Sequence, residues 1–405
     1  MNRLHGAFCL SVIVSFLAVA AVRASGNTFT IDAGTATDND QVKFTNAISA
    51  AAAGDTIFVH GGTYNMTGSL SLSKVGTAAM PFNIVSFPGE TPILDYRAQA
   101  IGGRGIQISG QYWNVKGLTV QYAGDNGVFI SGSNNTIQQV VARQNQDSGF
   151  TIQSSSNSIP SNNLILNCDS YGNYDIAAAG ENADGFAVKF RGLGAGNVLR
   201  GNRSWNNADD GYDFWQAEHG VTVQNCWSFH NGIRTMFVGS TTFNGDGNGI
   251  KLGHDSGTHA LSNMLIWGNP ANGVDVNGNA TQLEGDPPLI PHGVTIYNNT
   301  SFNNGGKNFN FDEDPTTASP PTNHVLRNNL SMNLGTTSSN VTVMTGNTQD
   351  HNTWNSGFPG SGVAVPDFIS TTDPVLTNGT FHPITDRKLD SDPTHTTPTY
   401  GTGAA

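Results

Sequence analysis

The sequence predicts an all-β protein that folds as a parallel β-helix with an N-terminal capping helix. Two repeated features predict this fold: nine-residue segments that end in asparagine, and a Gly-Φ-x-Φ motif (Φ is an apolar residue) shortly after each segment. The 49 glycines and the frequent V-x-I alternation favour β structure over helix. Because a solenoid grows in one dimension, a single one can accommodate most of the 405 residues.

The chain begins with a predicted signal peptide, residues 1–24. Arg3 precedes an apolar run from Ala7 to Ala21, and the small residue Ala24 marks the expected cleavage site. The alternative is a membrane anchor, but this apolar run is short for a membrane span. We therefore expect a secreted protein with no membrane contact after cleavage.

The remaining chain divides into a predicted β-helical domain, residues 25–345, and a C-terminal tail, residues 346–405. An alanine-rich run between Asp40 and Gly54 predicts a short helix, with Asp and Asn residues available for its N-cap. This helix is expected to cover the open first coil, because solenoids need caps. The tail is rich in Thr, Pro and Asp, which predicts irregular structure along the solenoid and a disordered end.

The nine-residue segments align without gaps, as in "ILNCDSYGN", Ile165–Asn173. Their sixth position is often serine and their seventh is mostly aromatic. In a β-helix one alignment column becomes a ladder with a step of about 4.8 Å, along which asparagine side chains can bond from coil to coil. A β-sandwich, the alternative fold, does not predict this register of final residues: Asn145, Asn173, Asn207, Asn231, Asn269 and Asn304.

The Gly-Φ-x-Φ motif predicts a strand whose two apolar side chains point inward and whose middle side chain points outward. Asp213 and Lys251 then occupy the same outward column on adjacent coils. Asp184 and Asp210 directly precede the motif glycine, so they are expected to stack on adjacent coils too. The predicted outward column runs through Thr151, Ala187, Asp213, Lys251, Asp275 and Asn310.

Two cysteines remain after signal cleavage, Cys168 and Cys226. They fall in one alignment column, with Asn202 on the coil between them. Two coil steps separate their Cα atoms by about 9–10 Å, whereas a disulfide needs less than about 7 Å. We therefore predict two free, buried thiols.

The predicted stacking gathers four carboxylates and one ammonium group on one patch. Such carboxylates repel one another unless a positive charge lies among them, and one lysine cannot balance four. A hard cation resolves the repulsion, and Ca²⁺ tolerates an irregular carboxylate set better than Mg²⁺ does. An EF-hand loop does not fit, because its spacing and distal Glu are missing. Asx-turns at the coil corners are the alternative explanation for these aspartates. They do not explain Asp213, which is expected on a strand, where aspartate is disfavoured. The residues are Asp184, Asp209, Asp210, Asp213 and Lys251.

Two insertions frame this patch, residues 174–184 and residues 232–248, and we expect them to wall a groove. Lys251 has three interpretations: a surface ion pair, a binder of an acidic ligand, or a general base. As a base it must lose its proton, and a nearby divalent cation lowers a lysine pKa. The formal net charge of −12, without a basic stripe, argues against nucleic-acid binding.

Three segments of the central coils, "ENADGFAVKF", "NRSWNNADDGYDFW" and "GNGIKLG", resemble the signature segments of polysaccharide lyase family 9. The resemblance covers roughly Asn163 to Asn304 and implies a right-handed parallel β-helix in a secreted pectate lyase. It implies that residues 25–345 are the catalytic domain and that an acidic polysaccharide, polygalacturonate, is the partner of a monomeric enzyme. The family's calcium ligands correspond to Asp184, Asp209, Asp210 and Asp213, and its catalytic lysine to Lys251.

In such a lyase, a neutral Lys251 would take the C5 proton, and calcium on the uronate carboxylate would disperse the charge that develops. Because lysine must be neutral to act, the expected pH optimum is above about 8. Arg234, in the second insertion, is a candidate to bind a second uronate carboxylate; an exposed loop arginine is the alternative. Three rival functions stay open. A β-helix glycoside hydrolase is suggested by "GHD" at Gly253–Asp255. The others are a noncatalytic calcium-dependent glycan binder and a C5-epimerase.

Overall fold

The computed structural model describes residues 26–35, 39–155, 158–237, 242–253, 257–276, 292–312, 322–333 and 340–355. The predicted signal peptide, most of the predicted tail, and His254 and Asp255 of the "GHD" segment lie outside these residues. Within them, no helix has the length and apolar character that crossing a membrane requires.

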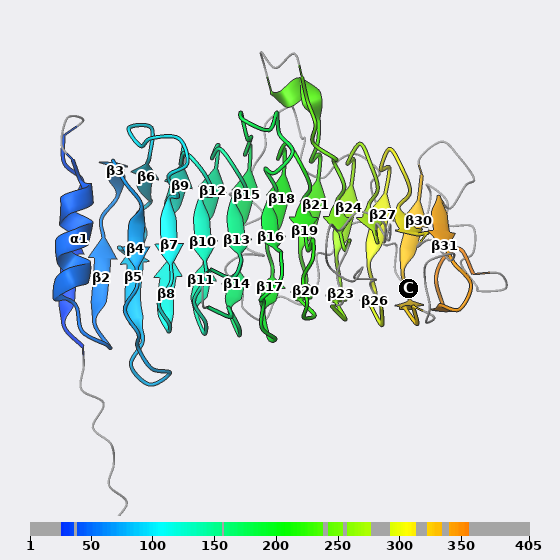
Figure 1. Ribbon diagram of the computed structural model, residues 1–405, viewed down its shortest axis with the longest axis horizontal. Helices are drawn as coiled ribbons and strands as arrows, with labels where there is room; N and C mark the ends of the chain where they lie inside the picture. The colour runs from blue at the N-terminus through cyan, green and yellow to red at the C-terminus, as the bar shows by residue number, and fades with distance from the viewer. Residues whose placement is uncertain are drawn as a thin grey trace, which may run out of the picture.

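The described strands form three parallel sheets that run side by side along the molecule (Figure 1), as a parallel β-helix requires. The first sheet contains β1 (Thr28–Ile31), β2 (Thr56–Val59), β5 (Phe82–Ser86), β8 (Trp113–Lys116), β11 (Thr136–Gln138), β14 (Leu164–Leu166), β17 (Val198–Arg200), β20 (Thr222–Gln224), β23 (Ala260–Ser262), β26 (Thr295–Tyr297), β29 (Val325–Arg327) and β32 (Thr348–Asp350). The second contains β4 (Leu70–Leu72), β7 (Ile106–Ile108), β10 (Val128–Ile130), β13 (Phe150–Ile152), β16 (Phe186–Val188), β19 (Tyr212–Asp213), β22 (Ile250–Lys251), β25 (Val274–Asp275), β28 (Phe309–Phe311) and β31 (Val341–Val343). The third contains β3 (Gly62–Asn65), β6 (Pro92–Asp95), β9 (Thr119–Gln121), β12 (Val141–Arg143), β15 (Asp169–Tyr171), β18 (Arg203–Trp205), β21 (Trp227–Phe229), β24 (Leu265–Trp267), β27 (Thr300–Phe302) and β30 (Leu330–Met332).

The second sheet has the predicted register. Ala187 pairs with Asp213, Asp213 with Lys251, and Lys251 with Asp275, so the predicted outward column is one continuous row. The apolar side chains on either side of each outward residue point into the solenoid and form its core, as the alternation predicts. Those of the central coils are fully buried: Phe186, Val188, Tyr212, Phe214, Ile250, Leu252, Val274 and Val276.

The asparagine ladder is present and continuous. The side-chain amide of Asn145 donates to Oδ1 of Asn173 at 2.9 Å, and Asn173 donates to Asn207 at 2.7 Å. The same contact continues through Asn231 and Asn269 to Asn304. Each side chain also accepts a backbone N–H of the preceding coil, so the ladder satisfies corner groups that would otherwise be buried without partners.

The two cysteines are free and buried, as predicted. They belong to a second ladder, in which a thiol takes the place of an asparagine. The backbone N–H of Cys168 donates to Oδ1 of Asn202 at 2.8 Å, and that of Asn202 donates to Sγ of Cys226 at 3.3 Å. Burial raises the pKa of the Cys226 thiol to about 12, so it stays protonated and unreactive.

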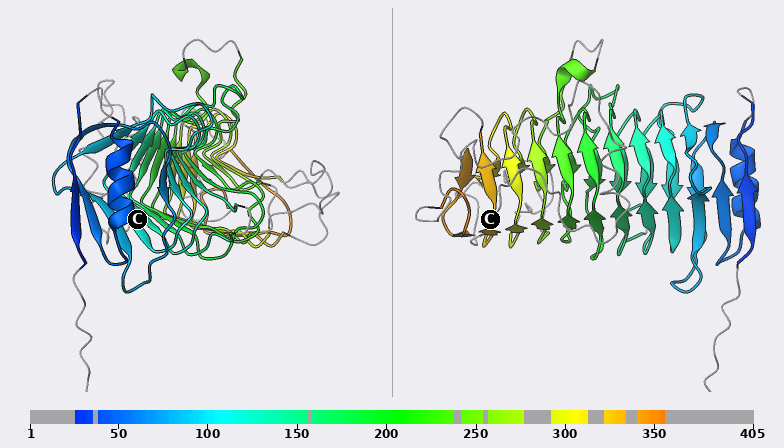
Figure 2. Two further views of the ribbon diagram at one scale, coloured as in Figure 1. Left: turned by 60° about the vertical axis from the view of Figure 1, so that its left-hand side comes forward. Right: turned by 180° about the vertical axis from the view of Figure 1, so that it is seen from behind.

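One helix, α1 (Gln41–Ala50), lies across the first coil (Figures 1 and 2), as the capping prediction requires. Its Phe44 is fully buried against the ring of Tyr64. The helix ends before Gly54, the expected terminator, because Ala51 is already extended. At the other end of the solenoid, β32 pairs with β29, so coil structure extends past the predicted boundary at residue 345.

Candidate active site and metal centre

The predicted acidic residues meet at the corner where the chain enters the second sheet, near the middle of the solenoid. Asp184 precedes β16, Asp209 and Asp210 precede β19, and Asp213 lies in β19 itself. All four are almost fully buried, with at most 3% of their surface exposed. Side chains that point away from the core are thus covered by their neighbours, which makes their mutual charge repulsion strong.

Three of the four carboxylates form a tight group. Asp184, Asp209 and Asp210 each present one oxygen, and these oxygens lie within 4.8 Å of one another. The chain fixes the other sides of two carboxylates, because Oδ1 of Asp209 accepts the N–H of Asp246 at 2.7 Å and Oδ1 of Asp210 accepts that of Asn248 at 2.7 Å.

The second oxygen of Asp210, Oδ2, is buried and accepts no hydrogen bond. Its ion-pair partner is Nζ of Lys251, at 3.5 Å. A buried carboxylate oxygen without a hydrogen bond is costly, and a bound cation removes that cost. Three converging carboxylates, one with such an oxygen, are a donor set that suits a hard divalent cation such as Ca²⁺.

Asp213 lies apart from this group of three and is held by protein donors on both oxygens. Its Oδ1 accepts the N–H of Trp215 at 2.9 Å, and its Oδ2 accepts Nζ of Lys189 at 3.1 Å. Lys189 also contacts Oδ2 of Asp184 at 2.7 Å. Lys189 was missing from the sequence-based site, although the in–out alternation after Gly185 places it outward, two residues past Ala187.

Lys251 lies at the edge of the acidic group, as predicted, but its shortest contact is to an unpredicted residue. Its Nζ is 2.7 Å from Oδ2 of Asp246, in the second insertion, and 5.2 Å from the ring centre of Trp215. Asp246 therefore joins two parts of the site: its backbone holds Asp209 and its side chain holds Lys251.

Burial and charge split the pKa values of the four aspartates. Burial raises the pKa of Asp184 to about 6, and it raises those of Asp209 and Asp210 well above the usual range, with repulsion from neighbouring carboxylates adding to the effect. Burial acts in the same direction on Asp213. There the nearby lysines and hydrogen bonds prevail and hold its pKa below the usual value.

The carboxylates act in the opposite sense on the two lysines. Burial would lower the pKa of Lys189 and Lys251, but the surrounding aspartates raise both. In the protein alone both ammonium groups thus stay charged. A divalent cation among the aspartates would repel the ammonium of Lys251 and lower its pKa.

The two insertions pack against each other, so they form one joint wall rather than separate flanks. The ring of Tyr174 stacks on Phe237 with centroids 5.0 Å apart, and the N–H of Asn244 donates to the carbonyl of Ala179 at 3.0 Å. Arg234 is exposed on a short helical turn, η1 (Arg234–Met236), which projects from the solenoid (green in Figures 1 and 2).

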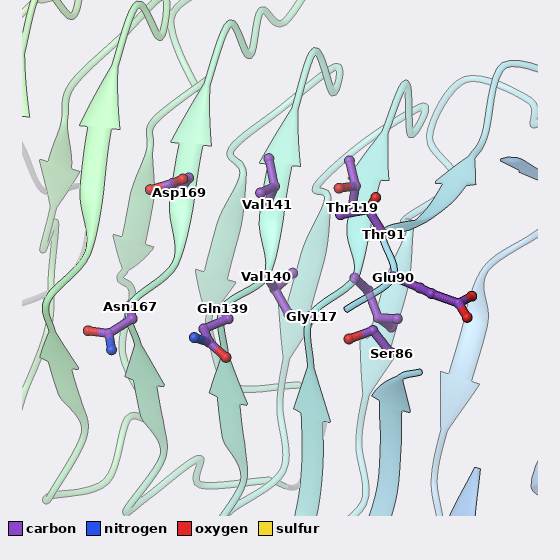
Figure 3. Close-up of a pocket in the computed structure, with 11 residues that line it drawn as sticks. Ser86, Glu90, Thr91, Gly117, Thr119, Gln139, Val140, Val141, Asn167 and Asp169 are labelled. Carbon is purple, nitrogen blue, oxygen red and sulfur yellow. The ribbon is translucent and has the colours of Figure 1, made fainter. Parts of the chain in front are cut away.

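A separate hollow of about 210 Å³ lies at the corner between the first and third sheets (Figure 3). Both of its acidic side chains have partners, since Asp169 pairs with Arg203 at 2.7 Å and Glu90 contacts the ring of His60 at 3.1 Å. The hollow therefore lacks the close group of carboxylates that marks the acidic site, and it is a weaker candidate for chemistry.

Comparison with known proteins agrees with the fold. Residues 25–329 match the family model described as "Pel9A-like, right handed beta helix region". Pectate lyase L of Paenibacillus polymyxa is 34% identical over 355 residues, which span 82% of this chain and 73% of that protein. Pectate lyase PEL9 of Emericella nidulans is 31% identical over 302 residues, which span 65% of this chain and 69% of that protein.

The crystal structure of pectate lyase Pel9A superposes with a TM-score of 0.76 at 27% identity, over 94% of this chain and 90% of that one. The family model spans most of the solenoid and includes all the residues of the acidic group. They confirm the resemblance to polysaccharide lyase family 9 that the three sequence segments suggested. The chain belongs to the Pel9A-like family of right-handed parallel β-helix pectate lyases.

Proposed function

We propose that this protein is a secreted pectate lyase that cleaves polygalacturonate by β-elimination, with Lys251 as the base beside a calcium site. The observation that carries the proposal is the contact between Lys251 and the group of Asp184, Asp209 and Asp210. A lyase needs a cation site for the substrate carboxylate and a base next to it, and this contact supports both roles.

Asp184, Asp209 and Asp210 would hold Ca²⁺, with Asp213 orienting the group through Lys189. When bound, the ion would neutralise a uronate carboxylate and stabilise the negative charge that develops next to it. The joint wall of the two insertions would position the polymer along the second sheet.

Lys251 would take the proton from C5 of the uronate at its Nζ. The electrons of the broken C5–H bond form a C4–C5 double bond, and those of the C4–O bond leave with the glycosidic oxygen, which then takes up a proton. The ring of Trp215 and the carboxylate of Asp246 hold Nζ in place before the proton moves. A hydrolase instead adds water and forms no double bond.

Two accessory proposals accompany this function. Arg234 would bind a second uronate carboxylate, since it is an exposed cation on the projecting η1 turn. Residues 1–24 would direct export of the enzyme, which would act as a monomer. Arg234→Ala should therefore raise the KM for the polymer. The mature protein should begin at Ser25.

The decisive experiment follows the ultraviolet absorbance of the unsaturated product on polygalacturonate, with calcium or with EDTA. Lys251→Met should lower kcat by about 10³-fold or more, because it keeps the chain length of lysine but removes the base. Lys116→Met, on an exposed lysine of β8 in the first sheet, is the matched control and should keep full activity.

Three results would contradict the proposal. Bond cleavage without a rise in absorbance would indicate a hydrolase. Calcium-dependent binding of the polymer without turnover would indicate a noncatalytic glycan binder. Inversion at C5 without chain cleavage would indicate an epimerase.

A further inference from the structure

Lys189 is a buried cation beside the acidic group that takes no part in the proposed proton transfer. Its residue surface is 8% exposed, and its Nζ lies 2.7 Å from Oδ2 of Asp184 and 3.1 Å from Oδ2 of Asp213. Asp147 on the preceding coil adds a further negative charge in its surroundings. The lysine thus joins two aspartates that lie on adjacent coils.

The contacts of Lys189 divide the carboxylate oxygens into two sets. It donates to the Oδ2 atoms of Asp184 and Asp213. Oδ2 of Asp210, which accepts no hydrogen bond, lies on the side of Lys251. Lys189 and Lys251 therefore contact different carboxylate oxygens, and Lys251 also contacts the insertion wall, through Asp246.

We propose that Lys189 is a built-in counter-cation, a positioning residue that keeps the aspartates folded together before calcium binds. The inference rests on the proposed calcium site. Buried carboxylates without compensating charge destabilise a fold strongly, so the metal-free protein needs an internal positive charge here. Calcium supplies the same kind of charge, so the need for Lys189 should be greatest in metal-free protein.

This proposal predicts that Lys189→Met lowers the Tm of the full chain by different amounts with and without calcium. Thermal unfolding measures the Tm in both conditions. In EDTA the variant should lose about 5–10 °C of Tm relative to the parent, because breaking a buried ion pair is strongly destabilising. In saturating calcium the loss should be at most half as large. By linkage, calcium should then bind the variant more tightly than the parent, which calorimetric titration measures directly.

Two further variants sharpen the test. Lys189→Arg restores the positive charge and should recover most of the metal-free Tm, whereas Lys116→Met should leave the Tm unchanged in both conditions. An equal loss of Tm with and without calcium would overturn the proposal, because it would mean that Lys189 only fills space.

If calcium raises the Tm of the parent, but raises the Tm of Lys189→Met by no more than that, only the counter-cation role fails. If calcium does not shift the Tm of the parent at all, the calcium site and the counter-cation role fail together. Neither result depends on the activity assay with Lys251→Met, so failure of the lyase chemistry is recognised separately.

Discussion

At the scale of single residues, Lys251 combines two opposing requirements. A general base must be neutral for part of the time, yet Asp210, Asp213 and Asp246 raise the pKa of Lys251 in the protein alone. Of these carboxylates, Asp246 is the closest to Nζ, and its side chain is 44% exposed. Water therefore screens this pair, and a polymer that enters the groove can compete for the ammonium group.

Replacing Asp246 with asparagine should move the activity of the enzyme to lower pH. The change removes one negative charge next to Nζ, so the pKa of Lys251 falls and the neutral base forms at lower pH. Because the pair is screened, we expect the rising limb of the kcat/KM profile to shift by only about 0.5–1 pH unit. The measurement is the pH dependence of kcat/KM at saturating calcium.

The matched control is Asp175→Asn, in the first insertion. The carboxylate of Asp175 bonds to Ala178 and Asn182 within that insertion, so the same loss of charge occurs without contact to the lysine. Its profile should coincide with that of the parent. A shift of the Asp246→Asn profile toward higher pH would show that Lys251 is not the group that titrates.

Sequence alone located the aspartates and Lys251 because their columns follow from the repeat. Asp246 was not predictable in the same way, because it lies in an insertion that has no counterpart on the other coils. Lys189 could have been predicted, since alternation along β16 places it outward, but the sequence argument assigned the missing positive charge to a metal ion instead of a second lysine. The positions of side chains on regular strands thus follow from the sequence repeat, whereas those in irregular insertions do not.

At the scale of structural elements, the asparagine ladder explains why the repeat could be read at all. The ladder side chains are buried, and each accepts a backbone N–H from the preceding coil and donates to the next asparagine, so few residue types can replace them. The helix end was less predictable, since Ala51 leaves the helix while the sequence is still rich in alanine.

Asn145→Ala should therefore destabilise the solenoid by about 2–3 kcal/mol. The substitution removes the acceptor for the N–H of Ala123, at 3.0 Å, and the donor to Oδ1 of Asn173, at 2.9 Å. Asn114→Ala is the control, because Asn114 is only half-buried and donates to Asn83 on the sheet surface; it should cost about 1 kcal/mol or less. Urea denaturation measures both, and equal losses would contradict a special role of the corner ladder.

At the scale of the whole molecule, the acidic group makes stability depend on pH in an unusual direction. Burial raises the pKa of Asp184 to about 6 and that of Asp147, one coil earlier, to about 7. Both bind protons more readily in the folded than in the unfolded chain, so they favour folding at low pH and oppose it once ionised. Asp213 has a lowered pKa, so its contribution is lost only at acidic pH, below its ordinary value.

We therefore predict that the metal-free protein loses stability as the pH rises from about 4 to 7, where most proteins gain or keep it. The urea midpoint in EDTA should be lower at about pH 8 than at about pH 5, and excess calcium should restore much of the difference by neutralising the ionised aspartates. Asp147→Asn should flatten the EDTA profile near pH 7 without removing the calcium effect, because it lies outside the group of three. A midpoint in EDTA that rises steadily over this range would mean that the aspartates are compensated without metal, and the calcium site would lose its electrostatic basis.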